Sequence, residues 1–98
     1  MPYSVTISER AQRNLDEIVA YLDQEWSIRI RDKYLTLLAR KVKFIAENPL
    51  MFQISSKRKT IRRCVVNKQT ALYYRIRKGE IEIVTIQHTR SNDRKLKF

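Results

Sequence analysis

Most of the residues that could do chemistry in this chain are cationic, and the excess of positive charge lies in its second half. Guanidinium and ammonium groups bind phosphate and carboxylate oxygens through charge-assisted hydrogen bonds. The simpler interpretation treats each side chain as a separate solvated charge, but the size of the local charge excess favours one continuous basic surface. The expected members of that surface are Lys57, Arg58, Lys59, Arg62, Arg63, Arg75, Arg77, Arg90, Arg94 and Lys95.

His88 is the only histidine in the chain. An imidazole titrates near pH ~6.5, so His88 suits proton transfer. The simpler interpretation is that it forms a hydrogen bond at the end of a strand and orients the tail. Cys64 is the only cysteine, and strand alternation makes it a small core residue. A structural zinc site needs about four nitrogen or sulfur ligands, so we predict no metal and no cofactor.

The charge is distributed unevenly along the chain. Residues 1–50 carry eight Lys or Arg against seven Asp or Glu, a net of +1. Residues 51–98 carry thirteen against three, a net of +10. Folding does not require such crowding, because like charges on a compact surface repel one another. An anionic partner is therefore expected, either nucleic acid or an acidic protein, with an anionic membrane surface as a weaker third possibility.

The length and composition suit one domain. We expect residues 1–98 to form a single unit, because 43% of the residues are hydrophobic, which is enough for one core. No apolar run in the sequence approaches the ~18–20 residues that cross a bilayer. The segment 1–5 does not read as a signal peptide. Together with the lone cysteine, this indicates a reducing cytoplasm.

The elements that must position the charged side chains begin with a short strand at residues 3–7, where apolar and polar residues alternate. Ser8 can cap a helix that runs to about residue 25, because apolar residues follow it at spacings of three and four. A second helix is expected at residues 28–47, and Pro49 ends it. The short connection makes the two helices an antiparallel hairpin.

After Pro49 the apolar period changes from 3.6 to 2, which predicts strands at residues 61–66, 70–77 and 80–87, with an extended segment or edge strand near residues 52–54. The order β-α-α-β-β-β predicts an α+β fold, in which an N-terminal antiparallel helix hairpin packs on one face of a mainly antiparallel sheet.

Alternation along the strand at 70–77 assigns its side chains to two faces. Leu72, Tyr74 and Ile76 are expected to face the core. Tyr73 is expected on the outer face with Ala71, Arg75 and Arg77, where it joins the candidate binding residues. The simpler interpretation of Tyr73 is a half-buried residue of the sheet.

Several segments follow one another with a characteristic order and spacing. They are Tyr3-Ser4-Val5-Thr6-Ile7-Ser8, Ile18-Val19-Ala20-Tyr21-Leu22, Asn48-Pro49, Ile61-Arg62-Arg63-Cys64-Val65, Leu72-Tyr73-Tyr74-Arg75-Ile76 and Ile86-Gln87-His88-Thr89-Arg90. Over nearly the whole chain, this pattern resembles the RelE/ParE superfamily of toxins from bacterial type II toxin–antitoxin systems. The resemblance implies a bacterial cytoplasmic protein that a cognate antitoxin holds inactive in a hetero-oligomer.

The superfamily has two kinds of activity, and the RelE-like kind cuts messenger RNA on the ribosome. Its pattern combines lysines before the last strands, an arginine on the middle strand, an arginine after the last strand and a tyrosine near the C-terminus. Lys57 and Lys59 can match the lysines, and Arg90 can match the second arginine. Ala71 stands at the middle-strand position, however, and no tyrosine follows Arg90.

These two empty positions favour the other, ParE-like kind, which inhibits DNA gyrase without known nuclease chemistry and stabilises plasmids. We therefore expect a toxin that binds a macromolecular target and does no catalysis. The alternative is a metal-independent endoribonuclease acting on ribosome-bound mRNA, in which His88 and Arg90 act with the loop of Lys57 and Lys59. A basic binding module without toxicity is a third possibility.

Overall fold

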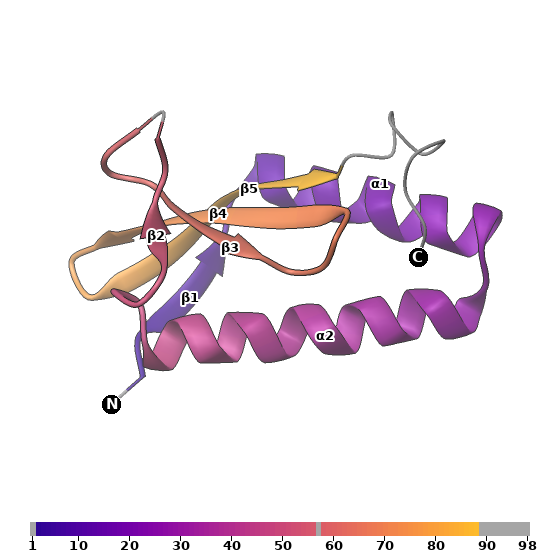
Figure 1. Cartoon of the computed structure of the whole chain (residues 1–98), viewed down its shortest axis with the longest axis horizontal. Coiled ribbons are helices and arrows are strands. Elements are labelled where there is room, and N and C mark those ends of the chain that lie inside the picture. The colour runs from indigo at the N-terminus through magenta and orange to yellow at the C-terminus, as the bar shows by residue number, and fades with distance from the viewer. Residues whose placement is uncertain (1, 57, 89–98) are drawn as a thin grey trace.

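Two helices and a five-stranded sheet make up the fold in this computed structural model, which describes residues 2–56 and 58–88 (Figure 1). The antiparallel helices contact each other and pack against the sheet, so the predicted α+β fold is confirmed. The extended segment after the second helix forms a two-residue strand. The elements are β1 (Ser4–Ile7), α1 (Glu9–Glu25), α2 (Ile28–Glu47), β2 (Gln53–Ile54), β3 (Arg62–Val65), β4 (Thr70–Arg77) and β5 (Glu80–His88).

Serine side chains start both helices. The amide of Ala11 donates to Ser8 Oγ at 3.0 Å, and the amide of Ile30 donates to Ser27 Oγ at 3.1 Å. Each bond satisfies one of the amides that a helix N-terminus leaves without an intrahelical partner. Within the part of the chain that the structure describes, neither helix has the apolar length that a bilayer crossing requires.

The sheet has the strand order β1-β5-β4-β3-β2. β1 lies parallel to β5, from Ser4 opposite Glu80 to Ile7 opposite Ile83, and the remaining pairs are antiparallel. The predicted mainly antiparallel sheet is therefore confirmed. The β4–β5 turn has positive φ at Lys78–Gly79, 51° and 78°. This is the geometry of a two-residue hairpin turn whose twist matches that of the strands.

A β-bulge interrupts β5. Tyr73 lies opposite Thr85, but the next residue of β4, Tyr74, lies opposite Ile83. Val84 is therefore the extra residue on β5. The bulge falls where β5 passes beyond the end of β1, so β1 does not pair with the second half of β5.

Helix α1 covers that edge. Ser8 Oγ donates to the carbonyl oxygen of Val84 at 2.8 Å. Further along, Asn14 Oδ1 accepts from the hydroxyl of Thr85 at 2.8 Å and from the amide of Ile86 at 3.1 Å. The first turn of α1 is thereby fixed beside the bulge.

The core lies between the helix hairpin and one face of the sheet. Leu22 and Ile45 contribute from the helices, and Leu72 and Tyr74 from β4, each with no more than 1% of its surface exposed. Cys64 is also fully buried, as expected for a small core residue. Burial raises the pKa of its thiol, while Lys41 has a smaller opposing influence. Cys64 is therefore less ready to ionise than a solvated thiol.

Tyr74 connects the sheet to the end of α2. Its hydroxyl donates to the carbonyl oxygen of Pro49 at 2.6 Å, and its ring meets that of Phe52 edge to face. Burial raises the pKa of Tyr74 to about 12; Arg62 lowers it and Cys64 raises it to smaller extents. The folded state therefore prefers the neutral phenol.

This preference makes stability depend on pH in the alkaline range. Between pH ~10, where the unfolded tyrosine ionises, and pH ~12, the folded state keeps a proton that the unfolded state has lost. The stability contribution is fully present below pH ~10 and is lost as the pH rises towards 12. By pH ~11, we expect the wild type to have lost about 1.4 kcal/mol relative to a Tyr74→Phe control, measured by urea unfolding. Equal losses in both proteins would contradict this assignment.

Candidate anion-binding groove

A groove of about 650 Å³ lies on the sheet face opposite the one that carries Leu72 and Tyr74. We call it the basic groove. Strands β2, β3, β4 and β5 contribute to it, together with the first turn of α1 and the segment that joins β2 to β3. Its lining residues are Arg10, Gln53, Ile54, Ser55, Ser56, Arg58, Ile61, Arg63, Tyr73, Val84, Thr85 and Gln87.

Arg63 and Tyr73 form the floor of the basic groove. They are cross-strand partners in the β3–β4 register, and Arg63 Nε donates to the Tyr73 hydroxyl oxygen at 3.1 Å. Because that oxygen accepts the bond, its own proton can be donated to a ligand. The terminal nitrogens of the Arg63 guanidinium keep further donors. The pair therefore presents several donors to one bound anion.

Two more guanidinium groups line the walls. Arg10 comes from the first turn of α1, which the bond from Ser8 to Val84 fixes beside β5. Arg58 comes from the opposite wall, where the amide of Ile61 donates to its carbonyl oxygen at 3.2 Å. Three arginines, from α1, from the segment between β2 and β3 and from β3, thus line one hollow.

The described residues that line the basic groove include no carboxylate, histidine or lysine. Its charged groups are all arginines, and serine, threonine and glutamine side chains supply neutral hydrogen-bonding groups. Such a lining can bind phosphate or carboxylate oxygens. The described residues that line it offer no imidazole or carboxyl group to exchange protons near neutral pH. Among residues 2–56 and 58–88, no cluster of three or more His, Cys, Asp or Glu could hold a metal ion.

Other arginines from the expected surface lie elsewhere. Arg62 lies opposite Tyr74 in the register, and its Nη1 donates to the carbonyl oxygens of Phe52 at 2.6 Å and Leu50 at 3.3 Å. It holds the segment after α2 in place. Arg75 pairs with Glu82, with Nε and Oε1 2.6 Å apart.

Of the other expected members, Arg77 is exposed at the end of β4, beside the hairpin turn. Lys59 is exposed in the segment before β3 and does not line the basic groove. Among the described residues of the expected surface, Arg58, Arg63 and Tyr73 line the basic groove, whereas Lys59, Arg62, Arg75 and Arg77 do not. Lys57, Arg90, Arg94 and Lys95 lie outside the described residues.

His88 lies outside the basic groove. It is half-buried at the end of β5, with its ring centroid 5.3 Å from that of Tyr21. It lines a neighbouring hollow of about 400 Å³, which also includes Arg10, Asn14 and Glu17. Of the residues expected for RNA cleavage, the structure describes His88 and Lys59, and Lys59 lines neither the basic groove nor the hollow beside His88.

Arg10 lines the basic groove but is not among the candidate binding residues that the sequence indicates. It lies in the half of the chain whose charges nearly balance, and it occupies a helix, so neither charge nor strand alternation indicated it. The one available signal was its place two residues after the cap Ser8, at the junction between the first strand and the first helix.

Comparison with known proteins places this geometry in context. The model of a family described as "ParE toxin of type II toxin-antitoxin system, parDE" matches residues 5–93. Toxin ParE1 of Caulobacter vibrioides is 32% identical over 90 residues, which cover 90% of this chain and 91% of that protein.

Solved structures share the fold at lower identity. A chain from the chromosomal ParDE system of P. aeruginosa has a TM-score of 0.72 and 19% identity, with 88% of this chain and 95% of that chain covered. A chain of the RelBE2 toxin–antitoxin complex from Mycobacterium tuberculosis has a TM-score of 0.59 and 19% identity, with 90% and 99% covered.

Proposed function

This chain belongs to the ParE family of toxins of type II toxin–antitoxin systems, and from that membership we propose that it arrests bacterial growth by binding DNA gyrase in the cytoplasm. The observation that carries the proposal is the family match over residues 5–93, together with 32% identity to Toxin ParE1. We further propose that a cognate antitoxin neutralises it in a hetero-oligomer. Structural neighbours described as toxin–antitoxin complexes support this partner.

The basic groove supports binding as the mode of action. Arg10, Arg58 and Arg63 offer fixed positive charge from three separate elements, and Tyr73 adds a hydroxyl donor. Arginine remains protonated at any physiological pH, so the groove keeps its charge but makes a poor proton shuttle. We propose that an acidic or phosphate-bearing surface of the gyrase complex occupies it.

A supercoiling assay with purified gyrase tests the target. We expect the purified chain to inhibit supercoiling at the concentration that arrests growth, because the target's loss of function must account for the arrest. Adding the product of the reading frame beside this gene, as the candidate antitoxin, should restore supercoiling. Undiminished supercoiling at a growth-arresting concentration would exclude gyrase as the target.

Transcript analysis during the same arrest separates the other two possibilities. We expect transcripts on translating ribosomes to stay intact. New cleavage sites in them would instead support the endoribonuclease, with His88 and Arg90 as its candidate groups. If growth were unimpaired in the presence of soluble, folded protein, the result would favour the third possibility, a basic binding module without toxicity.

A further inference from the structure

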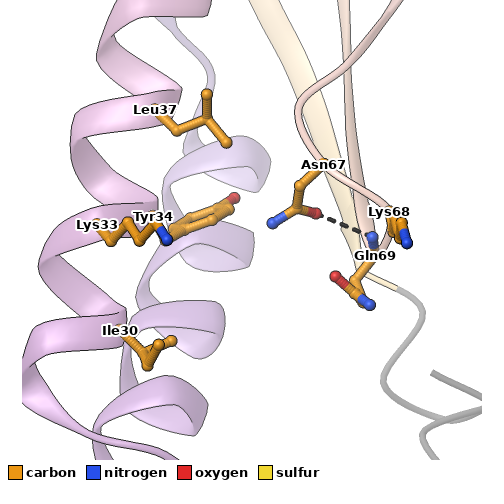
Figure 2. Close-up of a pocket in the computed structure, with 7 residues that line it drawn as sticks. All are labelled: Ile30, Lys33, Tyr34, Leu37, Asn67, Lys68 and Gln69. Atoms are coloured by element: carbon orange, nitrogen blue, oxygen red, sulfur yellow. Dashed lines mark hydrogen bonds between the residues drawn. The ribbon is translucent and has the colours of Figure 1, made fainter. Parts of the chain in front are cut away.

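Another pocket, of about 410 Å³, lies between α2 and the turn that joins β3 to β4 (Figure 2). We call it the α2–turn pocket. It shares no lining residue with the basic groove. The lining residues that matter here are Ile30, Lys33, Tyr34 and Leu37 from α2, and Asn67 and Lys68 from the turn.

Tyr34 brings an unsatisfied hydroxyl to this pocket. The residue is 4% exposed, and no described group lies in hydrogen-bonding geometry with its buried oxygen. Figure 2 shows its ring extending from α2 towards the turn. Burial raises the pKa of Tyr34, and a hydrogen-bond contribution from the Thr70 side chain, which falls short of full hydrogen-bonding geometry, lowers it to a smaller extent. The hydroxyl therefore carries its proton at physiological pH and can donate it to a ligand.

Asn67 brings a second donor from the opposite wall. Its Oδ1 accepts from the amides of Gln69 at 2.9 Å and Thr70 at 2.8 Å, and from the Thr70 hydroxyl at 3.1 Å. Because an amide proton can be given only to the oxygen, these bonds fix which way the Asn67 side chain is turned. Its Nδ2 consequently faces Tyr34 across the pocket (Figure 2).

The charged and apolar residues of the lining indicate the chemical class of the ligand. Lys33 on the helix and Lys68 on the turn are exposed cations, while Ile30 and Leu37 supply apolar wall. The pocket therefore combines apolar surface with neutral donors and positive charge. A carboxylate attached to an apolar group complements all three features.

We propose that the α2–turn pocket receives a segment of the antitoxin in which a bulky apolar side chain neighbours an Asp or Glu. The apolar side chain packs on Ile30 and Leu37. The carboxylate accepts from the Tyr34 hydroxyl and Asn67 Nδ2, with Lys33 and Lys68 as countercharges. This assignment rests on the proposed neutralisation by an antitoxin. The positive charges of Lys33 and Lys68 favour an acidic segment as the ligand of this pocket.

The decisive variant is Tyr34→Phe, because the proposal gives it two effects of opposite sign. Without its hydroxyl, the free chain no longer buries an unsatisfied polar group, so its melting temperature should rise. The same change removes a donor to a carboxylate, so affinity for the purified product of the adjacent reading frame should fall by about tenfold to a hundredfold, measured by calorimetry. A merely structural tyrosine would lower melting temperature and affinity together, which would overturn the proposal.

A pair of charge reversals provides the matched control. Lys68→Glu places a carboxylate beside the proposed acidic ligand and should weaken binding at least as much as Tyr34→Phe. Lys78→Glu makes the same change at the β4–β5 turn and should leave affinity unchanged.

The outcomes separate this site from the proposed function. Wild-type affinity in both Tyr34→Phe and Lys68→Glu would overturn the site while preserving the antitoxin. Failure of the adjacent product to bind the wild-type chain would remove both. A dimer of this chain that Tyr34→Phe dissociates would make a second copy the occupant and overturn the antitoxin assignment.

Discussion

Replacing Arg63 with glutamate is expected to abolish growth arrest while leaving the chain folded. The substitution removes the donor to Tyr73 and places a carboxylate on the groove floor between Arg10 and Arg58. Charge-assisted hydrogen bonds contribute about 1.5–3 kcal/mol each, so losing even one should weaken target binding by about tenfold or more. Repulsion of an anionic partner adds to that loss. Arg63 is exposed, so the free energy of unfolding should change by only about 0.5 kcal/mol.

Arg77→Glu is the matched control. It makes the same charge change at an exposed position of the same sheet, outside the basic groove. Growth after induced expression and thermal unfolding should be measured for both variants. We expect Arg77→Glu to retain growth arrest. Equal loss of arrest in the two variants would mean that net charge matters rather than the groove, and retained arrest in Arg63→Glu would remove the groove as the target site.

Replacing Tyr74 with alanine is expected to leave most of the chain unfolded. The side chain is completely buried, and removing a buried aromatic ring costs about 3–5 kcal/mol. The Pro49 carbonyl also loses its hydrogen bond, and an unsatisfied buried acceptor costs about 1–3 kcal/mol more. The sum approaches the entire stability of a small domain, about 5–15 kcal/mol.

Circular dichroism and urea unfolding would measure this loss of stability. Two control variants separate the contribution of the Tyr74 hydroxyl from that of its ring. Tyr74→Phe removes only the hydroxyl, so its free energy of unfolding should fall by about 1–3 kcal/mol. Tyr73→Ala removes a ring of similar size from the half-buried, opposite face, so it should cost much less. If Tyr74→Ala unfolded at the same urea concentration as Tyr73→Ala, Tyr74 would not be the link between sheet and helix described above.

The local elements could be predicted from sequence because their signals are local. Apolar spacing and the cap Ser8 located α1, Pro49 located the end of α2, and alternation located β3 to β5. The parallel pairing of Ser4 with Glu80 has no such signal. It depends on which free edge of the sheet remains when the other strands have paired, and that is a property of the whole chain.

The candidate site was only partly predictable for a related reason. Alternation shows that Arg62 and Arg63 point to opposite faces, but it cannot show which one finds partners. Arg62 donates hydrogen bonds to the carbonyl oxygens of Leu50 and Phe52, whereas Arg63 donates to the Tyr73 hydroxyl on the groove floor. Total charge likewise could not reveal that Glu82 engages Arg75.

The position of Arg10 and the shape of the α2–turn pocket depend on tertiary geometry. Arg10 reaches the groove because α1 is attached at the bulge, and a bulge leaves no clear mark in the apolar pattern of β5. The Tyr34 hydroxyl belongs to a residue of α2 that packs into the core. Periodicity identifies a buried residue, but it does not show whether its polar atom has a partner.

The pairing of β1 with β5 has a consequence for when the molecule becomes active. Of the strands that the structure describes, β1 is made first by the ribosome and lies beside β5, which is made last, and the bond from Ser8 to Val84 spans 76 positions of the chain. The chain must lose the entropy of closing this long loop before the contacts between β1 and β5 can stabilise the fold. A nascent chain therefore cannot assemble the groove wall that carries Arg10 until translation has passed β5, so a half-made molecule should be harmless to the cell that is synthesising it.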